Sequence, residues 1–111
     1  MQDDQRRAVR KELPDVIDAT NGVTGEVIGQ IANLSADGFM LIANQPMSEG
    51  AIYQISFVVA LPGDAMFNFS VGAEALWCSQ AKVADSYWIG MHIVDISESD
   101  AQAMGALIGG L

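Results

Sequence analysis

Four of the five basic residues in this chain, Arg6, Arg7, Arg10 and Lys11, fall within six positions near its start. The chain after them has one lysine, Lys82, against twelve Asp and Glu residues. Arginine presents five N–H donors in a planar fork that matches phosphate oxygens and the O6/N7 edge of guanine. Cations gathered in one segment of an acidic chain predict a site for a small anionic ligand, such as a nucleotide, because diffuse binding to a polyanion needs basic charge spread over a face.

A second polar group, Asn33, Ser35 and Gly38, begins 23 residues after Arg10. Asn33 offers a donor and an acceptor to a base, Ser35 offers a short hydroxyl, and Gly38 permits positive φ and close approach of a ligand. The same residue types serve tight turns, so this segment taken alone predicts only a turn. A basic cluster taken alone is most simply a solvated tail, so only the two segments together indicate a ligand-binding site.

Length, charge and residue counts narrow the class of protein. The chain has 111 residues, half of them apolar, which predicts one folded domain. Its net charge of −9 and pI of about 4.1 disfavour DNA, RNA and anionic lipid as partners. The apolar runs are far shorter than the ~20 residues of a membrane-spanning helix, and the charged start is unlike a signal peptide, so we expect a cytoplasmic protein without membrane insertion. One cysteine and one histidine leave too few ligands for a metal site, and no cofactor is expected.

Alternating apolar and polar residues, interrupted by turn residues, indicate an all-β fold. We expect strands at 23–32, 39–43, 53–61, 67–77 and 87–96, and turns at 33–38, 44–50 and 62–64. After the last strand the period changes to that of a helix, with Ser97 as its N-cap and Asp100 in its first turn. The apolar helical positions are Ala101, Met104, Leu107 or Ile108, and Leu111. Five or six antiparallel strands followed by one helix predict a closed or nearly closed barrel capped by that helix.

The order of these segments resembles the PilZ domain family of receptors for the bacterial second messenger cyclic di-GMP. The chain has Arg-x-x-x-Arg at Arg6 and Arg10, then Asn-x-Ser-x-x-Gly at 33–38, then hairpins and a late strand at 87–96. The resemblance covers nearly the whole chain, from Arg6 to the C-terminal helix. It implies a mainly β fold, a six-stranded antiparallel β-barrel of PilZ type with a C-terminal α-helix, and a ligand held on the outer surface of the barrel.

The resemblance also implies the ligand contacts. The motif positions Arg6, Arg10, Asn33, Ser35 and Gly38 are expected to bind cyclic di-GMP. Arg7 is a further candidate that lies outside the motif register. Residues 1–12 are then a flexible arginine segment that wraps the ligand, and residues 13–111 form the barrel and helix.

Other residues have alternative interpretations. Gln5 stands where some family members have an arginine that favours an intercalated ligand dimer, so we expect one bound ligand. Trp77 could stack on a guanine, but it alternates with Phe67, Phe69 and Val71, which favours a place in the core. His92 is expected on the barrel surface, and Gly90 at a bulge or bend. Cys78 has no evident base that would make it a nucleophile.

Three functions remain open, and the first is favoured. It is a cyclic di-GMP receptor that signals by ordering its N-terminal segment and altering its affinity for an unknown protein partner. The second is a PilZ-type adaptor that binds no ligand and acts by protein contacts in pilus or flagellar machinery; adaptors of that kind typically lack the arginine motif. The third is an unrelated small barrel whose basic tail binds another anion. No nucleophile–base pair or phosphate-binding glycine loop supports an enzyme.

Overall fold

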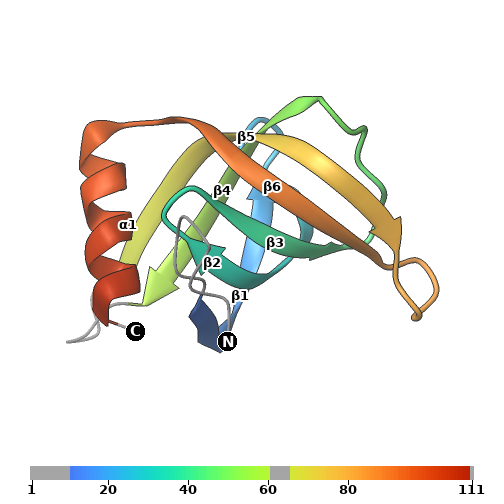
Figure 1. The fold of residues 1–111 in the computed structure, drawn as a ribbon, viewed down its shortest axis with the longest axis horizontal. Helices are drawn as coiled ribbons and strands as arrows, with labels where there is room; N and C mark the ends of the chain where they lie inside the picture. The colour runs from blue at the N-terminus through green and yellow to red at the C-terminus, as the bar shows by residue number, and fades with distance from the viewer. Residues whose placement is uncertain (1–10, 61–65, 111) are drawn as a thin grey trace, which may run out of the picture.

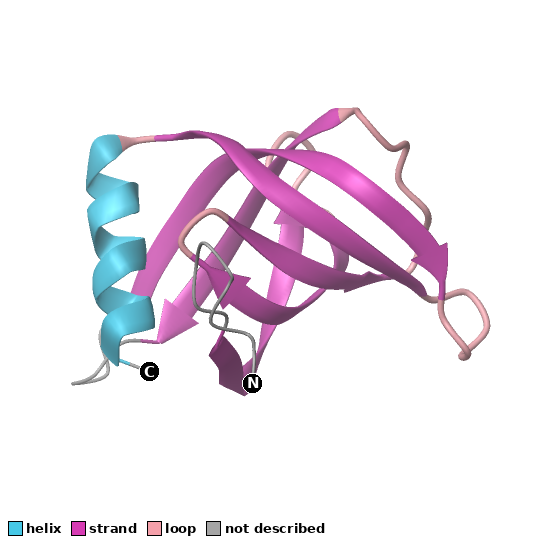
Figure 2. Cartoon of the chain, viewed as in Figure 1, coloured by secondary structure: helices cyan, strands magenta, loops and turns pink. Residues whose placement is uncertain are grey.

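The structure is a computed structural model that describes residues 11–60 and 66–110. Six strands and one helix follow one another along the chain (Figure 1). They are β1 (Lys11–Asn21), β2 (Val27–Ser35), β3 (Gly38–Ala43), β4 (Ile52–Ala60), β5 (Met66–Gln80), β6 (Tyr87–Ile96) and α1 (Glu98–Gly110). Figure 2 shows that strands form most of the described chain apart from α1, with loops and turns between them.

The strands close into one antiparallel barrel in the order β1-β2-β3-β6-β5-β4. Most neighbouring strands in the barrel also follow one another in the sequence, whereas β3 pairs with β6, which is distant from it along the chain. Among the residues that the structure describes, the barrel closes between β1 and β4 through two residue pairs, Thr20 with Ser56 and Asn21 with Ile55. The predicted barrel and its C-terminal helix are therefore confirmed.

The inner face of the barrel is a continuous apolar core. Three fully buried phenylalanines lie at its centre, with the ring centroids of Phe39 and Phe57 5.7 Å apart and those of Phe57 and Phe69 5.2 Å apart. Buried residues alternate with half-buried or exposed ones along β4 and along β3 from Phe39, as expected for strands with one solvated face, whereas β5 and β6 each contain a run of three buried residues. This alternation fixes which side chains reach the outer surface, where the candidate site lies.

Helix α1 stands beside the barrel and contributes three side chains to the core, Met104, Leu107 and Ile108 (Figure 1). Its N-terminus is capped as expected, because the backbone N–H of Asp100 donates to Ser97 Oγ at 3.1 Å. The Asp100 carboxylate in turn accepts a bond from the backbone N–H of Ser70 at 3.3 Å, which ties α1 to β5. No helix among the residues described is long and apolar enough to cross a membrane.

Two strands differ from their expected positions. The strand expected at 23–32 begins at Val27, because the Asn21 side chain accepts bonds from the N–H groups of Val23 and Thr24 and makes a turn there, leaving Val23 80% exposed. The alternation alone did not reveal β1, whose described core side chains are only Ile17 and Ala19. Strand β1 begins at Lys11 and so includes the last two residues of the expected 1–12 segment, whereas residues 1–10 lie outside the described residues.

Candidate functional site on the outer face of the barrel

The hairpin between β2 and β3 carries the second motif. Asn33 and Ser35 close β2, Ala36 and Asp37 form the turn, and Gly38 opens β3. Ser35 is fully buried, and its hydroxyl lies 2.9 Å from Asp37 Oδ1 and 3.1 Å from the Gly38 carbonyl oxygen, both acceptors. A hydroxyl has one proton to donate, so these two acceptors share it. Ser35 therefore fastens the turn, a role that the sequence did not reveal.

Gly38 is required by the barrel itself. A Cβ at this position would overlap the carbonyl oxygen of Met91 on β6, so only glycine lets β3 and β6 pair here. Among the described glycines, positive φ occurs at Gly25 and Gly50 and not at Gly38. The close approach expected at Gly38 is therefore found between two strands, and positive φ is not.

The start of β1 lies against the same hairpin. In the register of β1 with β2, Lys11 pairs with Leu34 and Glu12 pairs with Asn33. Strand β1 therefore starts beside the end of β2 that carries Asn33 and Ser35. Arg6, Arg7 and Arg10, together with Gln5, lie outside the described residues, so their contacts stay predictions.

Trp77 lies on the outer surface, and the expectation that it packs in the core is wrong. The pairing of β5 with β6 shifts between Ala75 and Trp77, with Leu76 as the extra residue of a bulge. The bulge breaks the alternation and leaves Trp77 41% exposed, opposite Gly90. A Cβ on Gly90 would overlap the indole, so the ring of Trp77 rests on Gly90. The bulge or bend was expected at Gly90 itself, whereas the bulge lies at Leu76, in the strand opposite Gly90.

These residues form one row across four strands. Asn33 on β2 pairs with Met40 on β3, Met40 pairs with Gly90 on β6, and Gly90 pairs with Trp77 on β5. Directly paired residues point to the same face of a sheet, which here is the outer face. Three strand spacings separate Asn33 from Trp77, about 14 Å along the surface. We call this surface, made by Asn33, Met40, Gly90 and Trp77, the outer row.

A hollow of about 280 Å³ opens at the other end of β2 and β3. It lies between the β1–β2 turn and the β3–β4 loop, with Tyr53 and Met47 in its wall and Glu26 as its one charged side chain. It therefore offers an anion no cation and lies away from the Asn33–Gly38 hairpin. Within the described ranges no group of three His, Cys, Asp or Glu residues is placed to hold a metal ion.

Comparison with known proteins gives a match to one family. The family model of the PilZ domain matches residues 4–110, which is almost the whole chain. A search of curated proteins found no match.

Solved structures share the fold at low sequence identity. The Bacillus subtilis inhibitor of motility MotI/DgrA superposes with a TM-score of 0.74 and 16% identity, over 89% of this chain and 47% of that one. The PilZ domain of Escherichia coli YcgR with c-di-GMP gives a TM-score of 0.68 and 17% identity, over 96% and 91% of the two chains. The structure of YcgR in complex with c-di-GMP gives 0.69 and 16%, over 96% and 45%. The present chain thus spans less than half the length of the motility inhibitor and of that YcgR chain.

Proposed function

This chain belongs to the PilZ domain family, and from that premise we propose that it is a receptor for cyclic di-GMP. PilZ domains are ligand-binding or adaptor domains and not enzymes, so the choice lies between a receptor and an adaptor that binds no ligand. The observation that carries the receptor proposal is the β1–β2 register. It pairs Lys11 and Glu12, which directly follow Arg10 in the sequence, with Leu34 and Asn33 at the hairpin of the second motif.

The chemistry of the two motifs suits the two kinds of group in the ligand, its phosphates and its guanines. Cyclic di-GMP has two phosphates and two guanines, so it needs cationic donors and partners for base edges. Arg6 and Arg10 each offer a bidentate fork to a phosphate or to the O6/N7 edge of guanine, and Arg7 supplies further positive charge. Asn33, on the outer row, offers an amide to a base edge. We infer that the arginine segment becomes ordered over the ligand when it binds.

Trp77 extends this proposed site. Its indole rests on Gly90 and keeps 41% of its surface exposed, in the same row as Asn33. Aromatic rings that stack on a base contribute about 1–3 kcal/mol to nucleic-acid binding. In our proposal a guanine of the ligand stacks on Trp77.

The proposed complex holds one cyclic di-GMP, since Gln5 replaces the arginine that favours a ligand dimer. The signal then passes to a protein partner through the surface that the ordered arginine segment creates. Among the similar structures, one has c-di-GMP in complex with YcgR and another is an inhibitor of motility. Both the ligand and a role in motility come to this chain only as proposals.

Isothermal titration calorimetry of the purified protein with cyclic di-GMP tests the proposal, with GTP and GMP as control ligands. We expect saturable binding of one cyclic di-GMP per chain and no comparable binding of the mononucleotides. Binding of two cyclic di-GMP molecules per chain would contradict only the prediction of one ligand drawn from Gln5, and the receptor role would stand. Absence of binding would overturn the receptor role and favour the adaptor.

A further inference from the structure

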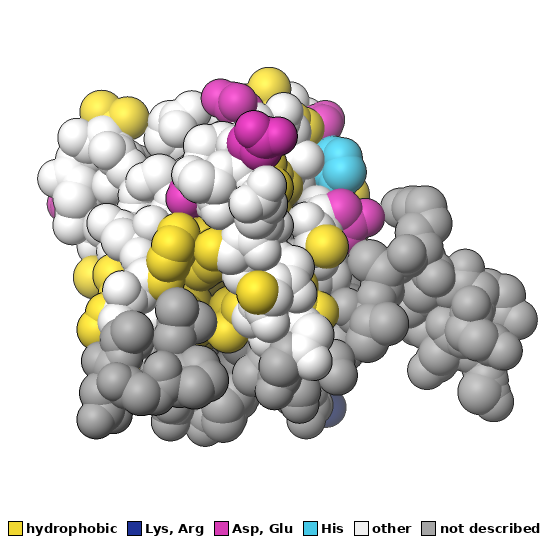
Figure 3. Space-filling model, turned by 90° about the vertical axis from the view of Figure 1, so that its left-hand side faces the viewer, with side chains coloured by type: hydrophobic (Ala, Val, Ile, Leu, Met, Phe, Trp, Pro, Cys, Tyr) yellow, Lys and Arg dark blue, Asp and Glu magenta, His cyan; other side chains and the backbone are white. Residues whose placement is uncertain are grey.

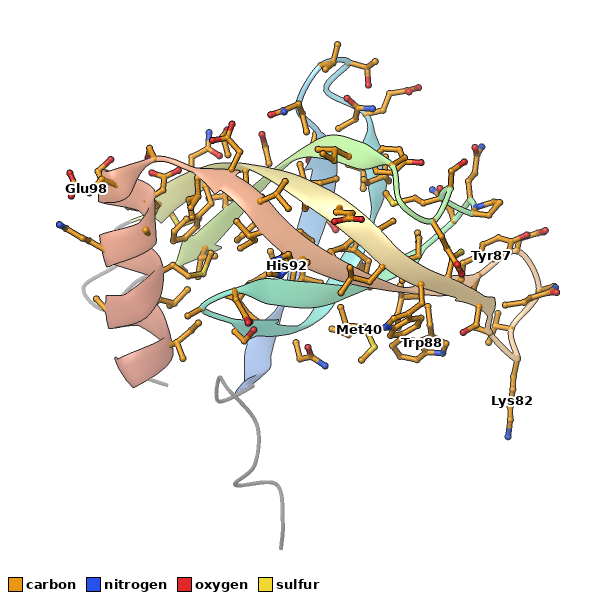
Figure 4. The ribbon with its side chains drawn as sticks, turned by 45° about the horizontal axis from the view of Figure 1, so that its top comes forward. Met40, Lys82, Tyr87, Trp88, His92 and Glu98 are labelled. Carbon is orange, nitrogen blue, oxygen red and sulfur yellow. The ribbon has the colours of Figure 1, made fainter. Side chains whose placement is uncertain are left out.

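His92, the only histidine in the chain, lies beside the proposed ligand site. On β6 it pairs with Gly38 of β3 on one side and with Glu74 of β5 on the other. Because paired residues share a face, His92 points to the same outer surface as Asn33 and Trp77. In Figure 4 its side chain lies between the ribbons of β6 and β3.

The neighbour of His92 on the motif side carries no side chain, and the two strands lie close together there. This neighbour is Gly38, and a Cβ built on it would lie 3.4 Å from the Cα of His92. The imidazole is half-buried and therefore keeps part of its surface for a ligand. A group bound over the Asn33–Gly38 hairpin would meet this ring.

Residues with carboxylate side chains lie near His92 in the sheet and in the adjoining turn. Glu74 is the partner of His92 on β5, and Asp95 lies three residues further along β6. Asp37 lies in the β2–β3 turn, where its backbone carbonyl accepts a hydrogen bond from the N–H of Ile93 at 2.8 Å. Figure 3 shows the histidine at the surface with carboxylate side chains around it. Strands β2 to β6 contain no lysine or arginine, so His92 is the one side chain of these strands that can become a cation.

We propose that His92 binds cyclic di-GMP as an imidazolium and that the complex takes up a proton at this residue. The inference rests on the receptor function proposed above. A neutral imidazole offers one N–H donor, whereas the imidazolium offers two and carries a positive charge toward a phosphate oxygen. The proton comes from solvent, and no bond of the ligand is made or broken.

The direction of the pH dependence follows from this assignment. The ligand phosphodiesters stay ionised throughout the range in which imidazoles titrate, roughly pH 5 to 8. Below that range an imidazole is charged with or without ligand, so the proposal predicts the highest affinity there and no proton uptake. As the pH rises through the range, the bound state must retain a proton that the free protein has lost, and the affinity falls. A tenfold preference of the ligand for the charged form gives up to about tenfold tighter binding at the acid end than at the alkaline end.

Calorimetry at about pH 6, 7 and 8, in pairs of buffers with different ionisation enthalpies, measures both the affinity and the protons taken up. For the native protein we expect tighter binding at about pH 6 than at about pH 8, by up to about tenfold, with fractional proton uptake near neutral pH. His92→Gln should lose the pH dependence and bind like the alkaline native protein. His92→Arg, which is charged at every pH, should keep the tighter binding at about pH 8 without proton uptake.

Lys82→Gln is the matched control. It removes a positive charge from the β5–β6 turn, away from the hairpin motif, and should leave the pH dependence intact (Figure 4). Proton uptake by the α-amino group would persist in His92→Gln, which separates it from uptake at His92. If the native protein binds equally well at all three pH values and His92→Gln changes nothing, the His92 inference is overturned while the receptor role stands. If no cyclic di-GMP binds at any pH, both the His92 inference and the receptor role are overturned.

Discussion

The indole of Trp77 on β5 occupies the space above Gly90 that any other residue at position 90 would need for its side chain. The two residues are paired across β5 and β6, at the point where the Leu76 bulge turns Trp77 outward. The bulge and the glycine act together: the first aims the ring at the surface, and the second lets it lie close against the sheet. A flat aromatic face is thereby held on the outer row, which also contains Asn33.

Gly90→Ala is expected to displace this ring. The added methyl group would overlap the indole, which must move outward and lose its packing on β6, at a cost of about 1–3 kcal/mol of folding free energy. Denaturant unfolding measures the loss, and a red shift of tryptophan emission reports the displaced indole. Weaker binding of cyclic di-GMP should accompany both.

Gly105→Ala provides the control for that experiment. Gly105 lies on the exposed side of α1, and a Cβ there would have no neighbour within 4 Å. Replacing a glycine within a helix by alanine should stabilise the protein by about 0.5–1 kcal/mol and leave the tryptophan emission unchanged. Equal effects of the two substitutions would show that the contact between Trp77 and Gly90 is unimportant.

Arg6→Ala and Arg10→Ala should each weaken binding of cyclic di-GMP while leaving the fold intact. Each removes one bidentate donor, worth about 1–3 kcal/mol at a guanine, which corresponds to about 5- to 150-fold in affinity. Calorimetry measures the binding, and circular dichroism with thermal unfolding checks the fold. A variant that lost its folded signal would show that the arginine is structural, and the site assignment would then be wrong.

Ser35→Ala should destabilise the protein. The Ser35 hydroxyl is buried and is a donor available to Asp37 Oδ1 and the Gly38 carbonyl, so its removal should cost about 1–3 kcal/mol and loosen the β2–β3 turn. The comparison is Ser79→Ala, at an exposed position of β5, which should stay within about 0.5 kcal/mol of the native stability in the same unfolding assay. Full stability of Ser35→Ala together with lost ligand binding would mean that Ser35 serves the ligand and not the turn.

The sequence predicted the parts of the fold that depend on local chemistry. The alternation from Tyr53 onward located β4, β5 and β6, and Ser97 identified the cap of α1. Pairing between distant strands was harder to predict from the residues. The Leu76 bulge reversed the expected direction of Trp77, because an extra residue changes the face of every side chain up to the next irregularity. His92 was expected on the surface, but only the pairing of β3 with β6 shows that it stands opposite Gly38.

The last prediction concerns salt and follows from the concentration of cations near the start of an acidic chain. A dianionic ligand approaches a protein of net charge −9, so long-range repulsion opposes the arginine cluster. Salt screens exposed charges beyond a Debye length of about 8 Å at physiological ionic strength, so it weakens the repulsion as well as the local attraction. The two effects partly cancel, and affinity measured between about 50 and 300 mM NaCl should change less than the arginine count alone suggests.

Removing residues 1–4 deletes Asp3 and Asp4 beside the cluster and should tighten binding modestly at low salt. A steep loss of affinity with salt, or weaker binding after this truncation, would mean that the acidic residues act too far from the site to influence the ligand.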